Sequence, residues 1–381
     1  MKKVGVALAF AAMATIFCSC MLIEKPITSR MSTTEPVSRP YALQPRTVMV
    51  DDITINYMEA GDGPNVILLH GGIIPYSLVK AYLNQPIYPL MINTGALATA
   101  DSWNYNITAL ARNFHVVAID LPGFGGSDKP DIDYSLEDYK IYLDAFMDVM
   151  DMDEAMLVGH GFGGQIAISY AMENPERVDR LVLVNSYGAW GARYPFLARS
   201  IKNKPVRFVS RFWQREKAAK AKTIYPLNKK MFRNWRKPTE WAVESMVSTE
   251  VVNAYPKNII VSKEGASGKF LDSIVDYKMK YITTDEYRKE VDATYKALLY
   301  TQAKELQGSF KDLDKPVLIA HGTHDPVVEL DEARYMEKMF PRATLILYEE
   351  SGHYPMVEEA DRFNQDVTFF LSGKDIAKAG N

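Results

Sequence analysis

From residue 46 onward, short apolar runs alternate with stretches of helical periodicity, and this alternation constrains the fold more than any other feature of the sequence. The apolar runs, which are rich in Val, Ile and Leu, fall at 47–50, 53–58, 66–69, 116–119, 155–158, 181–184, 317–320 and 344–348. Helical periodicity is clearest at 136–150, 162–174, 330–340 and 357–371. Short strands that alternate with amphipathic helices are typical of a doubly wound sheet. We therefore predict an α/β fold built on a mostly parallel sheet of about eight strands.

Glycine, histidine and aspartate follow five of the predicted strands, at the point where each strand ends. In chain order the segments are His70-Gly71-Gly72, Asp120 to Asp128, Gly159 to Gly164, His321 to Asp325, and Ser351-Gly352-His353. The functional groups of such a sheet gather at the carboxyl ends of its strands. These five segments, in this order, resemble the α/β-hydrolase superfamily over nearly all of residues 46–372, with residues 46–188 and 313–372 as the core.

The resemblance implies a Ser-His-Asp type site in which one member is changed. The family carries its nucleophile at the centre of Gly-x-Ser-x-Gly, on a sharp turn from strand to helix. In this sequence the central position is Gly161, which has no side-chain nucleophile. The resemblance further implies His353 as the base and Asp325 as the acid that orients its imidazole. Asn185, at the end of the run at 181–184, is an alternative orienting group.

The same resemblance assigns further residues to the surroundings of the site. The amides of Phe162 and of Gly71 or Gly72 are expected to stabilise an oxyanion. Trp103 and His160 are expected at the substrate pocket, although a histidine just before the turn can also be structural and point away from the pocket. The histidines and carboxylates show no zinc-ligand spacing, so neither a metal nor another cofactor is expected.

Three interpretations of Gly161 stay open. Glycine can replace a serine, through engineering or natural loss, in an enzyme that hydrolyses an ester or related acyl bond. The chain can instead be a non-catalytic protein that binds a ligand on the same scaffold. In the third interpretation, His353 and Asp325 activate water directly. The residues Phe162-Gly163-Gly164 resemble the serine esterases and carbon–carbon bond hydrolases, which favours serine over aspartate as the ancestral nucleophile.

The N-terminus has the pattern of an export signal. Two lysines precede an apolar run at 4–17, which is too short to span about 30 Å of hydrocarbon. Ser19-Cys20 resembles a bacterial lipoprotein processing site, with ordinary secretion as the alternative. We predict a signal peptide over 1–19, lipidation at Cys20 and a tether over 20–45. The expected location is outside a bacterial cytoplasm, as a membrane-anchored lipoprotein that faces the periplasm or the cell exterior.

Two long insertions are expected over the site. Residues 73–100 are apolar, with Lys80 as their one charged residue, and predict a lid that favours a small apolar or acyl substrate. Residues 189–312 lie where members of the superfamily carry a cap over the active site, so the resemblance implies a cap there. Its segment 193–237 holds fifteen Lys or Arg against one acid, Glu216. That segment can be a solvated face, a surface that meets anionic lipid headgroups, or a means of attracting an anionic substrate. The net charge of −3 argues against a nucleic-acid partner.

Overall fold

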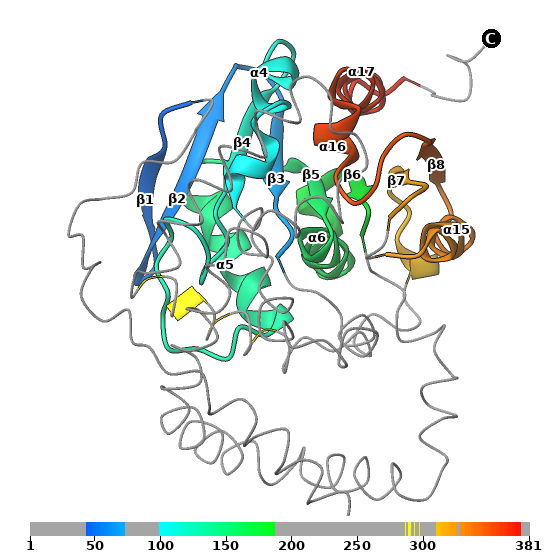
Figure 1. Cartoon of the computed structure of the whole chain (residues 1–381). Helices are drawn as coiled ribbons and strands as arrows, with labels where there is room; N and C mark the ends of the chain where they lie inside the picture. The colour runs from blue at the N-terminus through cyan, green and yellow to red at the C-terminus, as the bar shows by residue number, and fades with distance from the viewer. Residues whose placement is uncertain are drawn as a thin grey trace, which may run out of the picture. The chain divides into compact units, whose positions relative to one another are not determined.

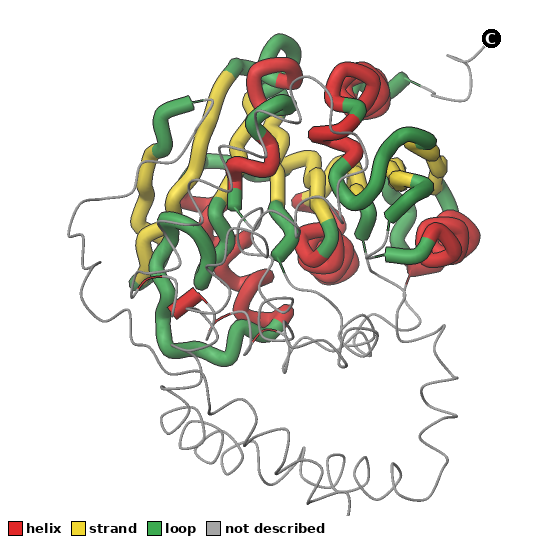
Figure 2. The backbone as a smooth tube through the Cα atoms, viewed as in Figure 1, coloured by secondary structure: helices red, strands yellow, loops and turns green. Residues whose placement is uncertain are grey.

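Eight strands form one sheet within the residues that the computed structural model describes, which are 43–72, 99–186, 310–325 and 328–374 together with 286, 289, 290, 293 and 297. The strand order is β1-β2-β4-β3-β5-β6-β7-β8 (Figures 1 and 2). The bounds are β1 Arg46–Val50, β2 Ile53–Ala60, β3 Asn65–Leu69, β4 His115–Ile119, β5 Ala155–His160, β6 Val178–Val184, β7 Val317–Gly322 and β8 Ala343–Tyr348. Only the β1–β2 and β2–β4 pairs of this sheet are antiparallel. The predicted fold class is confirmed.

Helices cover both faces of the sheet. Their bounds are η1 Ala100–Trp103, α4 Ile107–Leu110, α5 Leu136–Val149, α6 Phe162–Glu173, η2 Pro175–Arg177, η4 Phe310–Asp312, α15 Leu330–Met339, α16 Pro355–Glu358 and α17 Ala360–Leu371. In Figure 1, α4 and α17 lie together along one side of the sheet, and α5 and α6 lie together along the other. Strands β3, β5 and β7 are therefore buried almost throughout, as continuous runs of Val, Ile and Leu predict for a parallel sheet.

One helix boundary differs from its prediction. The periodicity at 357–371 predicts a single helix, but α16 and α17 are separated by Glu359, whose φ of −121° and ψ of 48° are not helical. The Glu359 carboxylate accepts hydrogen bonds from the Ser351 hydroxyl at 2.7 Å and from the Glu350 N–H at 3.1 Å. These bonds tie the break between the helices to the turn that follows β8.

The register brings the carboxyl ends of the central strands level with one another. His160 of β5 pairs with Val184 of β6, and Val184 pairs with Ala320 of β7. The next residues continue this alignment, because the Gly161 N–H donates to the Val184 carbonyl at 2.9 Å and the Asn185 N–H donates to the Ala320 carbonyl at 2.9 Å. The ends of these three strands, which carry Gly161, Asn185 and the segment His321 to Asp325, therefore lie in one row.

The loop after β4 contacts helical residues of the predicted cap. The Gly125 N–H donates to the buried Glu290 carboxylate at 3.2 Å. Lys129 forms an ion pair with Glu286 at 3.8 Å, and its ammonium also donates to the Gly125 carbonyl at 2.8 Å. Helical residues of the predicted cap are thus attached to the loop by polar contacts.

Asp120 attaches the same loop to the first residue of η1. Its carboxylate accepts hydrogen bonds from the Ala100 N–H at 2.7 Å and from the Gly126 N–H at 2.6 Å. Asn56 of β2 donates to it as well, at 2.9 Å. The loop is therefore fixed both to the sheet and to the last residue of the predicted lid.

Several predicted segments lie outside the described residues. They are the signal peptide, most of the tether, nearly all of the lid and most of the cap, including the basic segment 193–237. In the part of the chain that is described, we find no helix with the length and apolar character needed to cross a membrane.

Candidate active site

The turn between β5 and α6 has the backbone of a sharp strand-to-helix elbow. Gly161 is its central residue, with φ 53° and ψ −111°, and α6 begins at the next residue, Phe162. Residues with a Cβ rarely adopt such a conformation, whereas glycine adopts it readily. Gly161 therefore lies at the centre of a strand-to-helix turn, and its assignment as the nucleophile position stays a prediction.

The glycines that follow the elbow let α6 approach the sheet closely. A Cβ on Gly163 would lie 2.4 Å from the Leu69 carbonyl oxygen, and a Cβ on Gly164 would lie 1.8 Å from Ser186 Oγ. Both distances are too short for a carbon atom. Packing therefore requires glycine at these two positions, and the N-terminus of α6 is fixed against the ends of β3 and β6.

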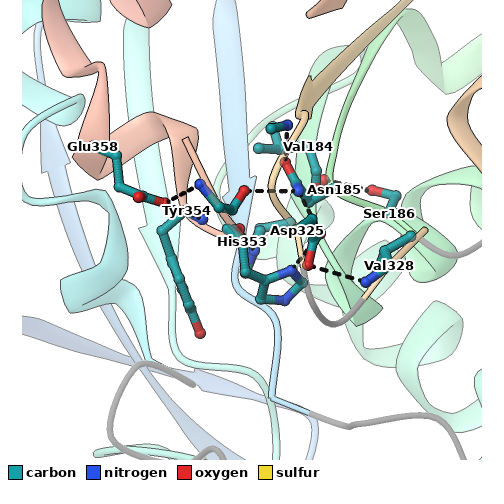
Figure 3. Close-up of polar contacts among 12 residues, drawn as sticks. Val184, Asn185, Ser186, Asp325, Val328, His353, Tyr354 and Glu358 are labelled. Atoms are coloured by element: carbon teal, nitrogen blue, oxygen red, sulfur yellow. Dashed lines mark hydrogen bonds and ion pairs between the residues drawn. The ribbon is translucent and has the colours of Figure 1, made fainter. Parts of the chain in front are cut away.

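His353 and Asp325 lie together at the same edge of the sheet (Figure 3). The His353 Nδ1 donates to Asp325 Oδ2 at 2.8 Å, and both side chains are buried. The carboxylate can only accept, so the proton lies on Nδ1 and Nε2 is left as the basic nitrogen of the neutral ring. This is the arrangement that a histidine base and its orienting acid require.

Two further donors surround the Asp325 carboxylate. The Val328 N–H donates to Oδ1 at 3.0 Å, and the Asn185 amide donates to Oδ2. Burial alone would raise the pKa of Asp325, but the charge and hydrogen bond of His353 and the Asn185 donor lower it, so that the pKa lies below its ordinary value. The Asp325 side chain is therefore ionised, and Asn185 contacts the acid rather than replacing it.

The backbone around the base is held at four points. We call Gly352-His353-Tyr354 the base loop. The Gly352 and Tyr354 N–H groups donate to Glu358 Oε1 at 2.9 and 3.0 Å, and the Gly352 carbonyl accepts from Asn185 at 3.2 Å. The His353 carbonyl accepts from His160 Nε2 at 2.9 Å. Glu358 was not predicted, because nothing in its local sequence distinguishes it from the other acids of α16 and α17.

His160 is fully buried and faces the base loop. Its ring centroid lies 4.6 Å from that of His353 and 4.6 Å from that of Tyr354. Because a carbonyl accepts its Nε2 proton, His160 Nδ1 carries no proton, and this atom makes no hydrogen bond within the described residues. Burial, followed by the neighbouring His353, lowers the pKa of His160 well below its ordinary value, so the ring is neutral.

The expected oxyanion donors lie on the two segments that border Gly161. Phe162 is the first residue of α6, so its N–H has no acceptor within the helix. Gly71 and Gly72 follow β3, and Gly72 has a positive φ of 139°. His70 shapes this segment, because its ring contacts the Gly71 carbonyl through Nδ1 and accepts the Leu121 N–H through Nε2. The oxyanion role of these amides stays a prediction.

Trp103 lies in the core on the α17 side of the sheet. The indole is fully buried and packs against Phe363, with ring centroids 6.4 Å apart. Its role as a pocket residue stays a prediction, because residues 73–98, which would share that pocket, lie outside the described part. Among the described residues, no group of three His, Cys, Asp or Glu side chains is placed to hold a metal ion.

Comparisons with known proteins connect this geometry to hydrolases. A 2-hydroxy-6-oxo-6-(2'-aminophenyl)hexa-2,4-dienoic acid hydrolase of Metapseudomonas resinovorans is 24% identical over 88% of this chain and 93% of the relative. Lipase 1 of Psychrobacter immobilis is 26% identical over 70% of this chain and 73% of its own length. The crystal structure of a bacterial membrane phospholipase A has a TM-score of 0.57 at 22% identity, and the match covers 98% of this chain and 99% of that one.

A family model described as the alpha/beta hydrolase fold matches residues 88–360. The matched range contains Gly161, Asp325 and His353 and begins after the His70-Gly71-Gly72 segment. With the eight-stranded sheet, the elbow and the His353–Asp325 pair in place, the match leads to one conclusion. The chain belongs to the alpha/beta hydrolase fold family.

Proposed function

We propose that this chain hydrolyses an ester or a related acyl bond of an apolar small molecule or lipid, with His353 as the base and Asp325 as its orienting acid. The observation that carries the proposal is the buried hydrogen bond between His353 Nδ1 and Asp325 Oδ2. A carboxylate in the interior costs free energy unless it is fully paired, and here several donors are arranged around it. The pair favours catalysis over ligand binding alone, because it leaves Nε2 of the imidazole as a basic nitrogen, which the binding of an apolar ligand does not require.

Because Gly161 has no nucleophile, the proposed attacking group is water. His353 Nε2 takes a proton from the water as the water oxygen bonds to the acyl carbon. The oxyanion that forms is stabilised by the Phe162 N–H and by the amides near Gly71 and Gly72. The bond to the leaving alcohol then breaks, and His353 returns the proton to the leaving oxygen. This route has no covalent intermediate, so we expect it to be slower than a serine-dependent one.

The substrate class is inferred from the relatives and from the lid sequence. The names lipase and phospholipase A, carried by two similar proteins, describe hydrolysis of acyl esters. The dienoic acid hydrolase shows that other substrates are processed on related chains. The apolar sequence at 73–100 favours an apolar or acyl substrate over a strongly charged one.

The test is hydrolysis of p-nitrophenyl esters, from acetate to palmitate, by protein that lacks residues 1–20. We expect activity in the unmodified chain and a loss of about 10²–10⁴-fold in His353→Ala, the usual contribution of a general base. Gly161→Ser is expected to raise the rate, and the double variant Gly161→Ser/His353→Ala to lose that gain. If none of the four proteins hydrolyses any ester while all remain folded, esters are the wrong substrate class.

Gly161 itself favours a second candidate, a ligand-binding protein without turnover. In that case only Gly161→Ser hydrolyses esters, and the unmodified chain binds them without cleavage. Isothermal titration with a non-hydrolysable ether analogue measures binding, and the ester assay measures turnover. Binding of the analogue without turnover of any ester in the unmodified chain would favour this candidate over the first.

We also propose that the protein is exported and anchored through a lipid on Cys20, with the basic segment 193–237 as a second contact with anionic membranes. The support is the sequence of residues 1–20 and the membrane phospholipase A that matches 98% of this chain. Labelling of cells with radioactive palmitate is expected to mark the unmodified protein and not Cys20→Ser. Equal labelling of both would refute the anchor.

A further inference from the structure

We propose that Asn185 is a positioning residue for this reaction, which limits how strongly Asp325 holds the proton of the His353 imidazole. The inference rests on the proposed role of His353 as the base. Asn185 donates to Asp325 Oδ2, the same oxygen that accepts the His353 Nδ1 proton (Figure 3). One carboxylate oxygen therefore has two donors, of which the imidazole N–H can ionise and the amide N–H cannot.

The orientation of the Asn185 amide is fixed by its partners. Its nitrogen faces Asp325 Oδ2 and the Gly352 carbonyl, which can only accept, and its oxygen accepts the Gly322 N–H at 3.2 Å. Exchange of the amide nitrogen and oxygen would place acceptors against acceptors and lose all three hydrogen bonds. These three hydrogen bonds therefore fix the amide with its nitrogen as the donor to Asp325.

The backbone of Asn185 also indicates a specialised position. The residue is fully buried and has a φ of 43°, in the left-handed region that asparagine tolerates better than most residues. Its side chain joins the segments after β6, β7 and β8, all of which supply residues to the site. Its partners are Gly322, the last residue of β7, Asp325, which follows β7, and Gly352, which follows β8.

The amide acts on the proton equilibrium of the His353–Asp325 pair by stabilising the carboxylate anion. Charge-assisted hydrogen bonds to a carboxylate favour its ionised form and make it a weaker proton acceptor. With Asn185 in place, the Nδ1 proton stays on the imidazole. Because the carboxylate then stabilises the imidazolium less strongly, His353 can return the proton that Nε2 takes up in the reaction. Without Asn185, Asp325 would hold that proton more strongly.

Other groups around His353 do not supply this effect. His160 and His321 are neutral, because burial lowers the pKa of each. Tyr354 packs edge-on against the His353 ring, at a centroid distance of 5.1 Å. Glu358 binds backbone N–H groups of the base loop. Asp325 is the titratable group that forms a hydrogen bond with the His353 ring.

The test uses ¹⁵N-histidine-labelled protein without substrate, so its outcome does not depend on turnover. The chain has six histidines, which makes the His353 ring signals assignable. In Asn185→Gly and in Asn185→Leu the Nδ1 proton signal of His353 is expected to move downfield, because its hydrogen bond to Asp325 strengthens. Glycine suits the positive φ, whereas leucine fills the volume of asparagine without a donor.

Ser186→Ala is the matched control. Ser186 is the next residue, and its hydroxyl donates to the Gly159 and Val184 carbonyls at 3.0 and 3.3 Å rather than to Asp325. Its His353 signal should stay at the position seen in the unmodified chain. Asp325→Asn provides calibration, since removal of the charged acceptor should move the signal upfield.

The pH dependence of turnover provides a second readout. On the acid side of the pH–rate profile, the midpoint of the fall in rate is expected to move to higher pH by about half a unit in both Asn185 variants. This shift corresponds to a roughly threefold increase in the proton affinity of the His353–Asp325 pair. If Asn185 only stabilised the base loop, its replacement would lower the rate at every pH and would leave the acid-side midpoint unchanged.

A folded Asn185→Leu protein with an unshifted His353 signal would overturn the proposal, whatever its turnover. If both variants fail to fold, the unmodified protein decides the question. As the pH is lowered and the His353–Asp325 pair takes up a proton, the NMR signals of the Asn185 side-chain amide are expected to shift. Signals that do not shift would refute the proposal. Absence of ester turnover, with the signal shifts present, would count against the proposed function alone.

Discussion

A side chain at position 161 should cost stability whether or not it brings activity. With φ 53° and ψ −111°, Gly161 has a backbone that disfavours any residue with a Cβ. Strain of this kind costs about 1–3 kcal/mol. Replacing glycine also reduces the freedom of the unfolded chain, which returns about 0.4–1 kcal/mol. The net expectation for Gly161→Ala and for Gly161→Ser is a loss of about 1–2 kcal/mol.

Equilibrium unfolding in urea measures this loss, from the midpoint and slope of each transition. The alanine and serine variants share the strain but differ in the hydroxyl, so they should be destabilised to within about 0.5 kcal/mol of one another. Only the serine variant should gain esterase activity. Midpoints equal to that of the unmodified chain would show that the elbow at 161 is relaxed, and would refute the strain argument.

Two further predictions concern buried groups. His160 has a lowered pKa in the folded chain and an ordinary value of 6.5, so the stability it contributes is complete above that value and is lost as the pH falls below it. Between pH 7 and 5 we therefore expect the free energy of unfolding to fall through this group. In His160→Gln, whose amide can still donate to the His353 carbonyl, urea titrations at the two pH values should show a smaller fall. If the pH dependence is unchanged in the variant, His160 is protonated in the fold. Gly164→Ala should destabilise by about 1–3 kcal/mol, because its Cβ would lie 1.8 Å from Ser186 Oγ and 2.6 Å from Ser186 Cβ. In double-mutant cycles Ser186→Gly should therefore rescue more than Ser186→Ala, and the reverse order would contradict the packing.

The strands were predictable because burial on both faces leaves a continuous apolar run. β6 shows the limit of this rule. It begins at Val178, three residues before the predicted run, because Asp179 and Arg180 are only partly buried and interrupt the apolar pattern. The break at Glu359 was missed for a different reason. Side-chain hydrogen bonds to the turn after β8, which periodicity does not reveal, hold that residue out of the helix.

The site was predictable where a local motif carries it. Gly161, Asp325 and His353 each follow a strand within a short segment rich in glycine. The contacts among these segments were not predictable, because Asn185 and Asp325 are 140 residues apart, and His160 and His353 are 193 apart. A local sequence pattern does not predict which loop a buried asparagine or histidine side chain contacts. The position of Asn185 at the end of a strand made it an alternative orienting group for His353. The structure shows that Asn185 contacts Asp325 instead.

The loop after β4 has a consequence for how substrate range can diverge on this scaffold. Through Asp120 it is anchored to the end of the lid insertion, and through Gly125 it is anchored to Glu290 of the cap. A transplanted cap with an apolar residue in place of Glu290 would leave the Gly125 N–H buried without an acceptor, at a cost of about 1–3 kcal/mol. Cap-swapped chimeras should therefore lose about that much stability unless they keep an acceptor for the Gly125 N–H.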